Sequence, residues 1–242
     1  MRYLLVAIFG TFLLGKVYAY QAQPPSASTE TALVSGTITL PPAQARSTRS
    51  LRGYAYRARG TSDNSVNKNT MEDRFFNTIV SAHPVSYTIE NLPTSDTTRI
   101  DQKDAVFIHK VTPVTVGSTI QFVNSDPFYH NVFSLTPGAK FNIGRRPTGD
   151  IYEKEVPPTK WKVSGLGPIS IYCDIHTQMN AIILSLDTPY FTRTKADGTY
   201  QLTGLPAGTY ELRVYNKDLE LSIQKITVAA GESYTFNFSM VN

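Results

Sequence analysis

The feature that most constrains this chain is a two-residue alternation of apolar and polar side chains that recurs along most of its length. It is clear in "SGTITL" at 35–40, "STIQFVN" at 118–124, "NAIILSLD" at 180–187 and "TYELRVY" at 209–215. Successive side chains of a β-strand point to opposite faces, so this period is typical of half-buried strands. Such runs are short and are bounded by Gly, Pro, Asn and Asp, which favour turns. The sequence therefore predicts an all-β protein built from sandwiches.

Some segments are harder to assign. On the same pattern, "RGYAYRA" at 52–58, "PVSYTIE" at 84–90 and "WKV" at 161–163 are predicted to be strands. The polar segment 60–80 is predicted to be an insertion loop. Within this region, "NTMEDRFFNTIV" at 69–80 could carry one helical turn.

The first 19 residues have the composition of an export signal. Arg2 gives a positive start, an apolar run covers 4–14, and residues 17–19 fit a cleavage site with small residues. A run of about 11 residues is shorter than the roughly 20 that a membrane-spanning helix needs. We therefore expect cleavage, no stable membrane insertion, and a mature protein that begins at Tyr20 in the periplasm or outside the cell.

The charge and the cysteine content exclude some classes of protein. Cleavage would remove the positive charges of Arg2 and Lys16, so the formal net charge of +4 would become +2. This is too small to indicate nucleic-acid binding. The single cysteine excludes an internal disulfide framework. Residues 20–31 are polar and rich in Pro and Ser, and they predict a flexible lead-in.

The last part of the chain carries a recognisable pair of hairpins. In "DGTYQLTGLPAGTYELRV" at 197–214, Asp-Gly and Pro-Ala-Gly turns separate alternating strands. This stretch resembles the carboxypeptidase regulatory-like domain, a small transthyretin-like β-sandwich. That module opens with a strand of the type seen far upstream at 34–42, "VSGTITLPP".

This separation suggests that one sandwich is nested inside the other. We expect opening strands at 32–92 to pair with the regulatory-like domain at 188–242, while 93–187 form a separate inserted sandwich. Three consecutive units remain the alternative.

A possible metal site stands out in "YCDIHTQM" at 172–179. It offers Cys173, His176 and Met179 with the spacing C-x2-H-x2-M, and "IQFVNSDPFYHNVFS" at 120–134 supplies His130 from a distant strand. Two imidazoles, one thiolate and a weak thioether are the ligands of a type 1 copper site. Zinc would accept the first three but gains little from the thioether.

These same segments resemble the cupredoxin family. "VTPVTVGSTIQFVNSDPFYHNVFS" at 111–134 is similar to its sheet with the first ligand, and "GPISIYCDIHTQM" at 167–179 to its ligand loop, with the short spacing of amicyanin. The wider chain resembles exported plastocyanin-like proteins often called methylamine utilisation proteins. The resemblance implies a Greek-key β-sandwich holding one type 1 copper ion. The ligands it implies are His130, Cys173, His176 and Met179.

The chain departs from this pattern at Ile108, where proline is expected before His109, and in the long insertion. His83 and His109 fall outside the ligand pattern and are predicted to be surface or structural residues. Asn131 follows the first ligand and either clamps the ligand loop by a hydrogen bond or serves a plain turn. Each proposed ligand also has a simpler interpretation as a packing residue of the core.

The predicted function is transfer of single electrons to and from a redox protein, without catalysis. In the family that the chain resembles, the electron leaves by the second histidine through an apolar patch. The candidates for this patch are Pro127, Phe128, Tyr129 and Ile175. Two alternatives remain open: a copper carrier, and a cell-surface module that binds protein or glycan and has a vestigial metal site. The sequence does not indicate the oligomeric state.

Overall fold

The computed structural model of the chain describes residues 30–42, 70–95 and 97–241. This part contains 17 strands and one short helix, so the prediction of an all-β protein is confirmed. The predicted signal peptide, most of the lead-in and the predicted strand at 52–58 lie outside the described residues. Within the described part, no helix is long and apolar enough to cross a membrane.

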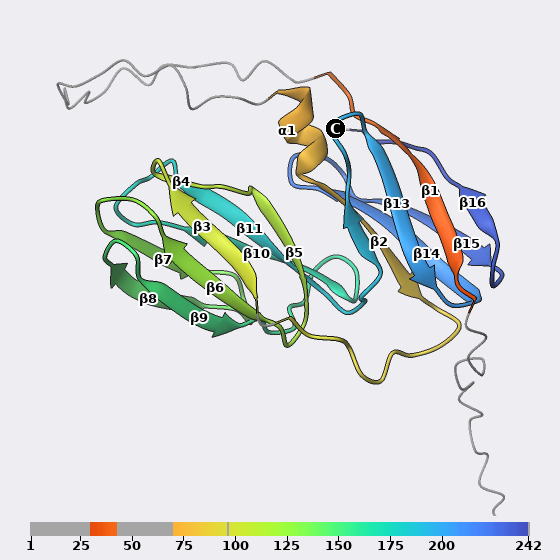
Figure 1. Ribbon diagram of the computed structural model, residues 1–242, viewed down its shortest axis with the longest axis horizontal. Helices are drawn as coiled ribbons and strands as arrows, with labels where there is room; N and C mark the ends of the chain where they lie inside the picture. Colours follow the sequence, from red (N-terminus) through yellow and green to blue (C-terminus); the bar gives the residue numbers. More distant parts are fainter. Residues whose placement is uncertain (1–29, 43–69, 96, 242) are drawn as a thin grey trace, which may run out of the picture.

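Strands from both halves of the chain form one sandwich, on the right in Figure 1. They are β1 (Ala32–Thr39), β2 (Thr78–Pro84), β12 (Phe191–Arg193), β13 (Thr199–Leu205), β14 (Gly208–Asn216), β15 (Ser222–Val228), β16 (Ser233–Thr235) and β17 (Phe238–Ser239). One sheet has the order β13-β1-β16, with β17 also beside β1, and the other has the order β12-β2-β14-β15. Both β1 and β2 therefore pair with strands that come after the second sandwich in the sequence.

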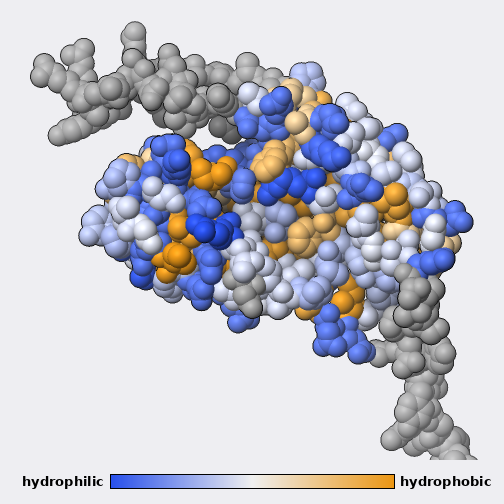
Figure 2. All heavy atoms as spheres, viewed as in Figure 1, coloured by the Kyte–Doolittle hydropathy of each residue, from blue (hydrophilic) through white to orange (hydrophobic). Residues whose placement is uncertain are grey.

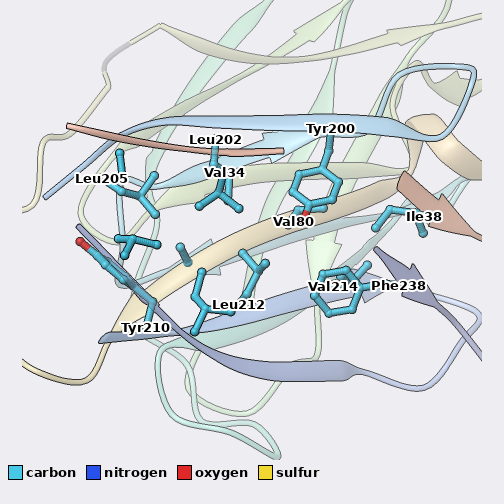
Figure 3. Close-up of a cluster of buried hydrophobic side chains, with 14 of the residues drawn as sticks. Val34, Ile38, Val80, Tyr200, Leu202, Leu205, Tyr210, Leu212, Val214 and Phe238 are labelled. Atoms are coloured by element: carbon cyan, nitrogen blue, oxygen red, sulfur yellow. The ribbon is translucent and has the colours of Figure 1, made fainter. Parts of the chain in front are cut away.

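The two sheets of this sandwich enclose a core of apolar side chains (Figure 3). Val34 and Leu202 from one sheet face Leu212 and Val214 from the other, and all four are buried. Gly36 lies where β1 passes closest to the backbone of a neighbouring segment. A Cβ atom at this position would overlap the carbonyl oxygen of Phe236, which explains the glycine inside an otherwise regular strand.

The second sandwich is formed by consecutive strands, on the left in Figure 1. They are β3 (Thr98–Lys103), β4 (Val106–Phe107), β5 (Val111–Thr115), β6 (Thr119–Asn124), β7 (His130–Ser134), β8 (Phe141–Arg146), β9 (Ile151–Glu155), β10 (Leu166–Tyr172) and β11 (Asn180–Leu186). The sheet orders are β5-β11-β10-β7-β8 and β4-β3-β6-β9. Its core contains Phe122 and Ile171 together with Cys173 and Met179.

The expectation of an insertion loop at 60–80 is wrong for residues 71–80, while the expected helical turn is confirmed. Helix α1 spans Met71–Phe76 and begins with a capping box, in which the side chains of Thr70 and Asp73 each accept a hydrogen bond from the other's backbone amide. Strand β2 follows at once and lies inside its sheet. Val80 faces the core of the first sandwich and Ile79 contacts the second sandwich, so β2 is buried on both faces.

Two of the predicted strands are not strands in the structure. Strand β2 ends at Pro84, and the segment after it bends so that the Tyr87 hydroxyl lies 2.8 Å from that of Tyr210. At 161–163 the chain is also irregular. The ring of Trp161 packs edge-on against Tyr215, with ring centroids 5.8 Å apart. In both segments an aromatic residue contacts a tyrosine of β14, although the segment itself does not pair as a strand.

A third apolar cluster joins the two sandwiches. It combines Ile79 and Tyr215 of the first sandwich with Leu184 and Leu186 of the second. Backbone groups of the second sandwich also accept hydrogen bonds from the first, including one of 2.6 Å from Arg213 to the Ser164 carbonyl oxygen. In the space-filling view the two sandwiches meet closely, and exposed apolar residues lie in small separate groups (Figure 2).

A chain of polar contacts, which runs from two buried residues to an exposed carboxylate, reinforces this joint. His83 on β2 is 4% exposed, and its Nδ1 lies 2.8 Å from a carboxylate oxygen of Asp187, at the end of β11. Its Nε2 lies 3.0 Å from the hydroxyl of Ser81, which is itself buried. Burial lowers the pKa of His83 and outweighs the hydrogen bond to Asp187, while the nearby Arg213 lowers it further. His83 therefore has a structural role.

This arrangement predicts that His83 makes the copper-free protein less stable as the pH falls below about 6.5, its ordinary pKa. Below that value the unfolded chain holds a proton on His83 that the folded chain resists, so unfolding takes up protons and becomes easier. In the variant His83→Gln the free energy of unfolding should fall less between pH 7.5 and pH 5.5 than in the wild type. Urea titrations at both pH values measure this difference, and equal falls would contradict the prediction.

Candidate metal centre

Pairing between β7 and β10 brings two distant parts of the chain together. The strands are antiparallel, with Phe133 opposite Tyr172. Residues that precede Phe133 therefore lie beside residues that follow Tyr172. His130 is the first residue of β7, and Cys173 comes directly after β10. The register of this pair thus places the imidazole and the thiol at the same end of the sheet.

Three of the four predicted ligands converge at this point. The Nδ1 atom of His130 lies 3.9 Å from the Sγ atom of Cys173, and the Nδ1 atom of His176 lies 3.8 Å from it. One ligand atom from each of the three residues lies within 4.8 Å of the others. Two nitrogens and one sulfur thus surround a small space into which each can direct a lone pair.

The loop between β10 and β11 is closed by its own backbone. The amide of Cys173 donates to the carbonyl oxygen of Met179 at 3.2 Å, and the amide of Met179 donates to the carbonyl oxygen of His176 at 2.9 Å. Met179 is 1% exposed and belongs to the same apolar core as Cys173. The short spacing of the three residues therefore folds into a tight loop, with the methionine side chain turned inward.

The site is dry on one side and open on the other. His130 and Cys173 are buried, whereas His176 is partly exposed. Partial burial, together with the neighbouring His130, lowers the pKa of His176, which leaves its ring neutral and able to bind a metal at neutral pH. Two imidazoles and a thiolate suit copper or zinc, and a buried methionine in the same core as Cys173 favours copper. The residues present therefore fit a copper ion.

A residue that the sequence analysis missed touches the first histidine. The Nε2 atom of His130 lies 2.6 Å from a carboxylate oxygen of Asp126, and Asp126 is only 3% exposed. Burial alone would raise the pKa of this carboxyl group, but hydrogen bonds from the Ala105 amide, from His130 and from the Asp104 amide outweigh burial and lower it. Because an ionised carboxylate can only accept, Nε2 carries the proton. In the neutral ring, Nδ1 then presents its lone pair to Cys173.

A second missed residue holds the loop that leads to His130. The side-chain amide of Asn124 donates to the carbonyl oxygens of Phe128 at 2.8 Å and Arg146 at 3.0 Å. Its oxygen accepts from the backbone amide of Asp126 at 2.9 Å. Asn124 is fully buried. The sequence did contain a signal for both residues, because Asp126 lies four positions before the candidate ligand His130 and Asn124 lies two positions before Asp126.

The residues of the predicted partner patch are all exposed in the structure. Pro127, Phe128 and Tyr129 lie on the loop before β7, and Ile175 lies next to His176. The Phe128 ring packs against both histidines of the cluster, with centroids 5.2 Å from that of His130 and 5.3 Å from that of His176.

Asn131 is buried beside the site. Its side-chain oxygen has no hydrogen-bond partner among the described residues. The expected clamp across the ligand loop therefore stays a prediction.

The other two histidines lie away from the cluster. His109 is in the segment between β4 and β5, where its ring packs against Phe76 at 5.1 Å. Burial lowers its pKa, with a further contribution from Arg193. His83 is fixed at the joint between the sandwiches. Neither belongs to the group of described residues that could hold a metal ion.

The role of Asn124 predicts a large effect of its removal. The variant Asn124→Ala removes three hydrogen bonds that a fully buried side chain makes to the backbone, so the metal-free protein should lose about 2–4 kcal/mol of unfolding free energy. Chemical denaturation followed by circular dichroism measures this loss. The matched control is Asn142→Ala, which removes an exposed bond to the Gly144 amide and should cost less than about 1 kcal/mol. Similar losses in both variants would contradict the assigned role.

A comparison with protein-family models bears on the resemblance of the last part of the chain. Residues 180–241 match the family model described as the carboxypeptidase regulatory-like domain, which confirms the resemblance found there. The match begins with β11, which pairs in the other sandwich, and does not include β1 or β2. Comparison with curated protein sequences gives no match.

Cupredoxins are among the solved structures that the chain is similar to. A purple cupredoxin from Nitrosopumilus maritimus is 20% identical, with 36% of this chain and 98% of that chain covered and a TM-score of 0.30. A point mutant of amicyanin in its reduced state is 14% identical, with 45% of this chain and 98% of that chain covered and a TM-score of 0.31. The Cu-containing nitrite reductase of Thermus scotoductus SA-01 is 24% identical, with 43% of this chain and 25% of that chain covered and a TM-score of 0.33. At these values the functions of those proteins do not transfer to this chain.

Proposed function

We propose that this protein is an exported carrier of single electrons that holds one type 1 copper ion. The observation that carries the proposal is the convergence of two imidazole Nδ1 atoms on the thiol of Cys173 at 3.8 and 3.9 Å. His130, Cys173 and His176 would be the strong ligands and Met179 the weak axial ligand. Bound copper would supply the change between two oxidation states.

The surrounding residues support this role by limiting movement. His130 sits on a strand and is held by Asp126, and the loop from Cys173 to Met179 is closed by backbone hydrogen bonds. A site whose ligands are already in place changes shape little when the charge of the metal changes. Full burial of His130 and Cys173 also argues against a carrier that releases its ion readily.

We also propose that the two sandwiches have separate tasks. Residues 93–187 would form the copper domain. Residues 32–92 and 188–242 would form the regulatory-like domain, which the pairing of β1 with β13 and of β2 with β14 supports. The export signal at 1–19 would deliver the protein to the periplasm or the cell exterior.

The exposed apolar residues around His176 suit contact with a redox protein. Small and weak interfaces are typical of electron-transfer encounters. Phe128 covers both histidine rings, so this residue belongs as much to the site as to the surface. Tyr129 is 57% exposed and has no such contact with the rings, which makes it the better position to probe.

The copper site predicts a strong visible absorption band. When the purified protein receives Cu(II), charge transfer from the Cys173 thiolate should give an intense band that disappears on reduction. The variant Cys173→Ala should lack the band, while His109→Ala, which removes a histidine outside the cluster, should keep it. A wild-type protein that takes up Cu(II) without such a band would overturn the proposal, as would exclusive binding of zinc.

The patch predicts a change in electron exchange. In Tyr129→Glu, the negative charges of two molecules would face each other, so self-exchange between oxidised and reduced protein should slow by about tenfold, corresponding to ~1.4 kcal/mol. The absorption band should stay unchanged. Leu135→Glu, which charges an exposed apolar residue after the other end of β7, is the control and should exchange at the wild-type rate. NMR line broadening in partly oxidised samples measures the rates, and equal rates would remove the patch from the mechanism.

A further inference from the structure

Asp126 is the only acidic side chain that is buried in the described part of the chain. A carboxylate in an apolar core is costly unless hydrogen bonds and charge compensate it. Here all of its described partners are hydrogen-bond donors: the Asp104 amide at 2.6 Å, the Ala105 amide at 3.0 Å and the ring of His130 at 2.6 Å. The fold therefore keeps an ionised carboxylate in contact with a candidate ligand.

We propose that Asp126 is a positioning residue that acts through His130 to favour Cu(II) over Cu(I) and so sets a lower reduction potential. This inference rests on the proposed copper site and adds a residue that determines its redox properties. It is carried by the 2.6 Å contact between Asp126 and His130 and by the placement of the opposite ring nitrogen, Nδ1, toward Cys173.

The direction of the effect follows from the charge. A hydrogen bond from a ligating histidine to a carboxylate fixes the orientation of the ring and makes the ligating nitrogen more basic. A more basic nitrogen, with a negative charge behind it, stabilises the doubly charged ion more than the singly charged one. Since the carboxylate is 3% exposed, water screens this interaction little.

The hairpin between β3 and β4 shows how the carboxylate is held. Its two turn residues, Asp104 and Ala105, both have φ of 55°, a conformation that is unusual for residues other than glycine. This turn directs their two amide groups at the carboxylate of Asp126. The hairpin therefore holds both oxygens of the Asp126 carboxylate, which in turn holds the ring of His130.

The first test compares two substitutions that each remove one negative charge. In Asp126→Asn, the affinity for Cu(II) relative to Cu(I) should fall about tenfold, which raises the one-electron reduction potential by about 59 mV. The control is Asp150→Asn. Asp150 pairs with Arg146 at 3.5 Å, and Arg146 lies opposite His130 in the β7–β8 pairing, but Asp150 does not touch the ring. Its loss should shift the potential much less.

Cyclic voltammetry of the copper-loaded proteins gives the potentials. The inference is overturned if the potential of Asp126→Asn equals that of the wild type or of Asp150→Asn. Thermal unfolding of the copper-free variants reports on the fold, and a purely structural role of Asp126 would lower the unfolding temperature without moving the potential.

A measurement on the unmodified protein covers the case in which Asp126→Asn does not fold. In the Cu(I)-loaded wild type, the Nε2–H proton of His130 should resonate far downfield and exchange slowly with water because of its short bond to a buried carboxylate. The Nε2–H of the partly exposed His176 is the internal reference. Equally fast exchange of both protons would overturn the inference.

The outcomes separate this inference from the proposed function. Absence of a copper–thiolate band from the wild type would overturn both. A wild-type band, combined with an unshifted potential in Asp126→Asn, would overturn only the role of Asp126 and leave the copper site intact.

Discussion

The candidate site depends on the antiparallel pairing of β7 with β10. His130 and Cys173 are 43 positions apart in the sequence, and the register that sets Phe133 opposite Tyr172 brings them to one end of the sheet. A slip of one residue would turn the side chains of a strand to the opposite face. Val132 of β7 and Ile169 and Ile171 of β10 belong to one core, so burial fixes the register that gathers the candidate ligands. The stability of this sandwich and the geometry of the candidate site thus depend on the same backbone contacts.

Several polar residues around the site and at the joint enter the interior together with their hydrogen-bond partners, whereas the side-chain oxygen of the buried Asn131 has none among the described residues. Asn124 uses both ends of its side chain on backbone groups, and Asp126 receives three hydrogen bonds. At the joint, His83 lies between Ser81 and Asp187. Satisfied buried networks make a unique arrangement of the chain more favourable than its alternatives.

Much of this was accessible from the sequence, because period-two alternation and ligand spacing are local signals. These two signals were enough to predict the all-β class and the convergence of Cys173 and His176. Strand β2 was hidden because its first residues directly follow a short helix in a polar segment. Ser81 and His83 also place polar groups on the face that meets the second sandwich, so the strand lacks a long apolar run. The contact between Asp126 and His130 was missed because it depends on the turn geometry of the loop between them, which residue types alone do not specify.

The position of β1 has a consequence for the order in which the chain assembles. Thr37 is hydrogen-bonded to Asn237, 200 positions away, so β1 finds its neighbours only when nearly the whole chain is present. The pairings of β3 to β11 are all internal to that unit, which can therefore form first. Once this inserted sandwich has folded, β2 and β12 are joined by a compact unit instead of a long flexible loop. Pairing β2 with β12 then costs less conformational entropy, because the ends of that loop are already close together. The inserted sandwich would then act as a template that speeds the folding of the sandwich around it.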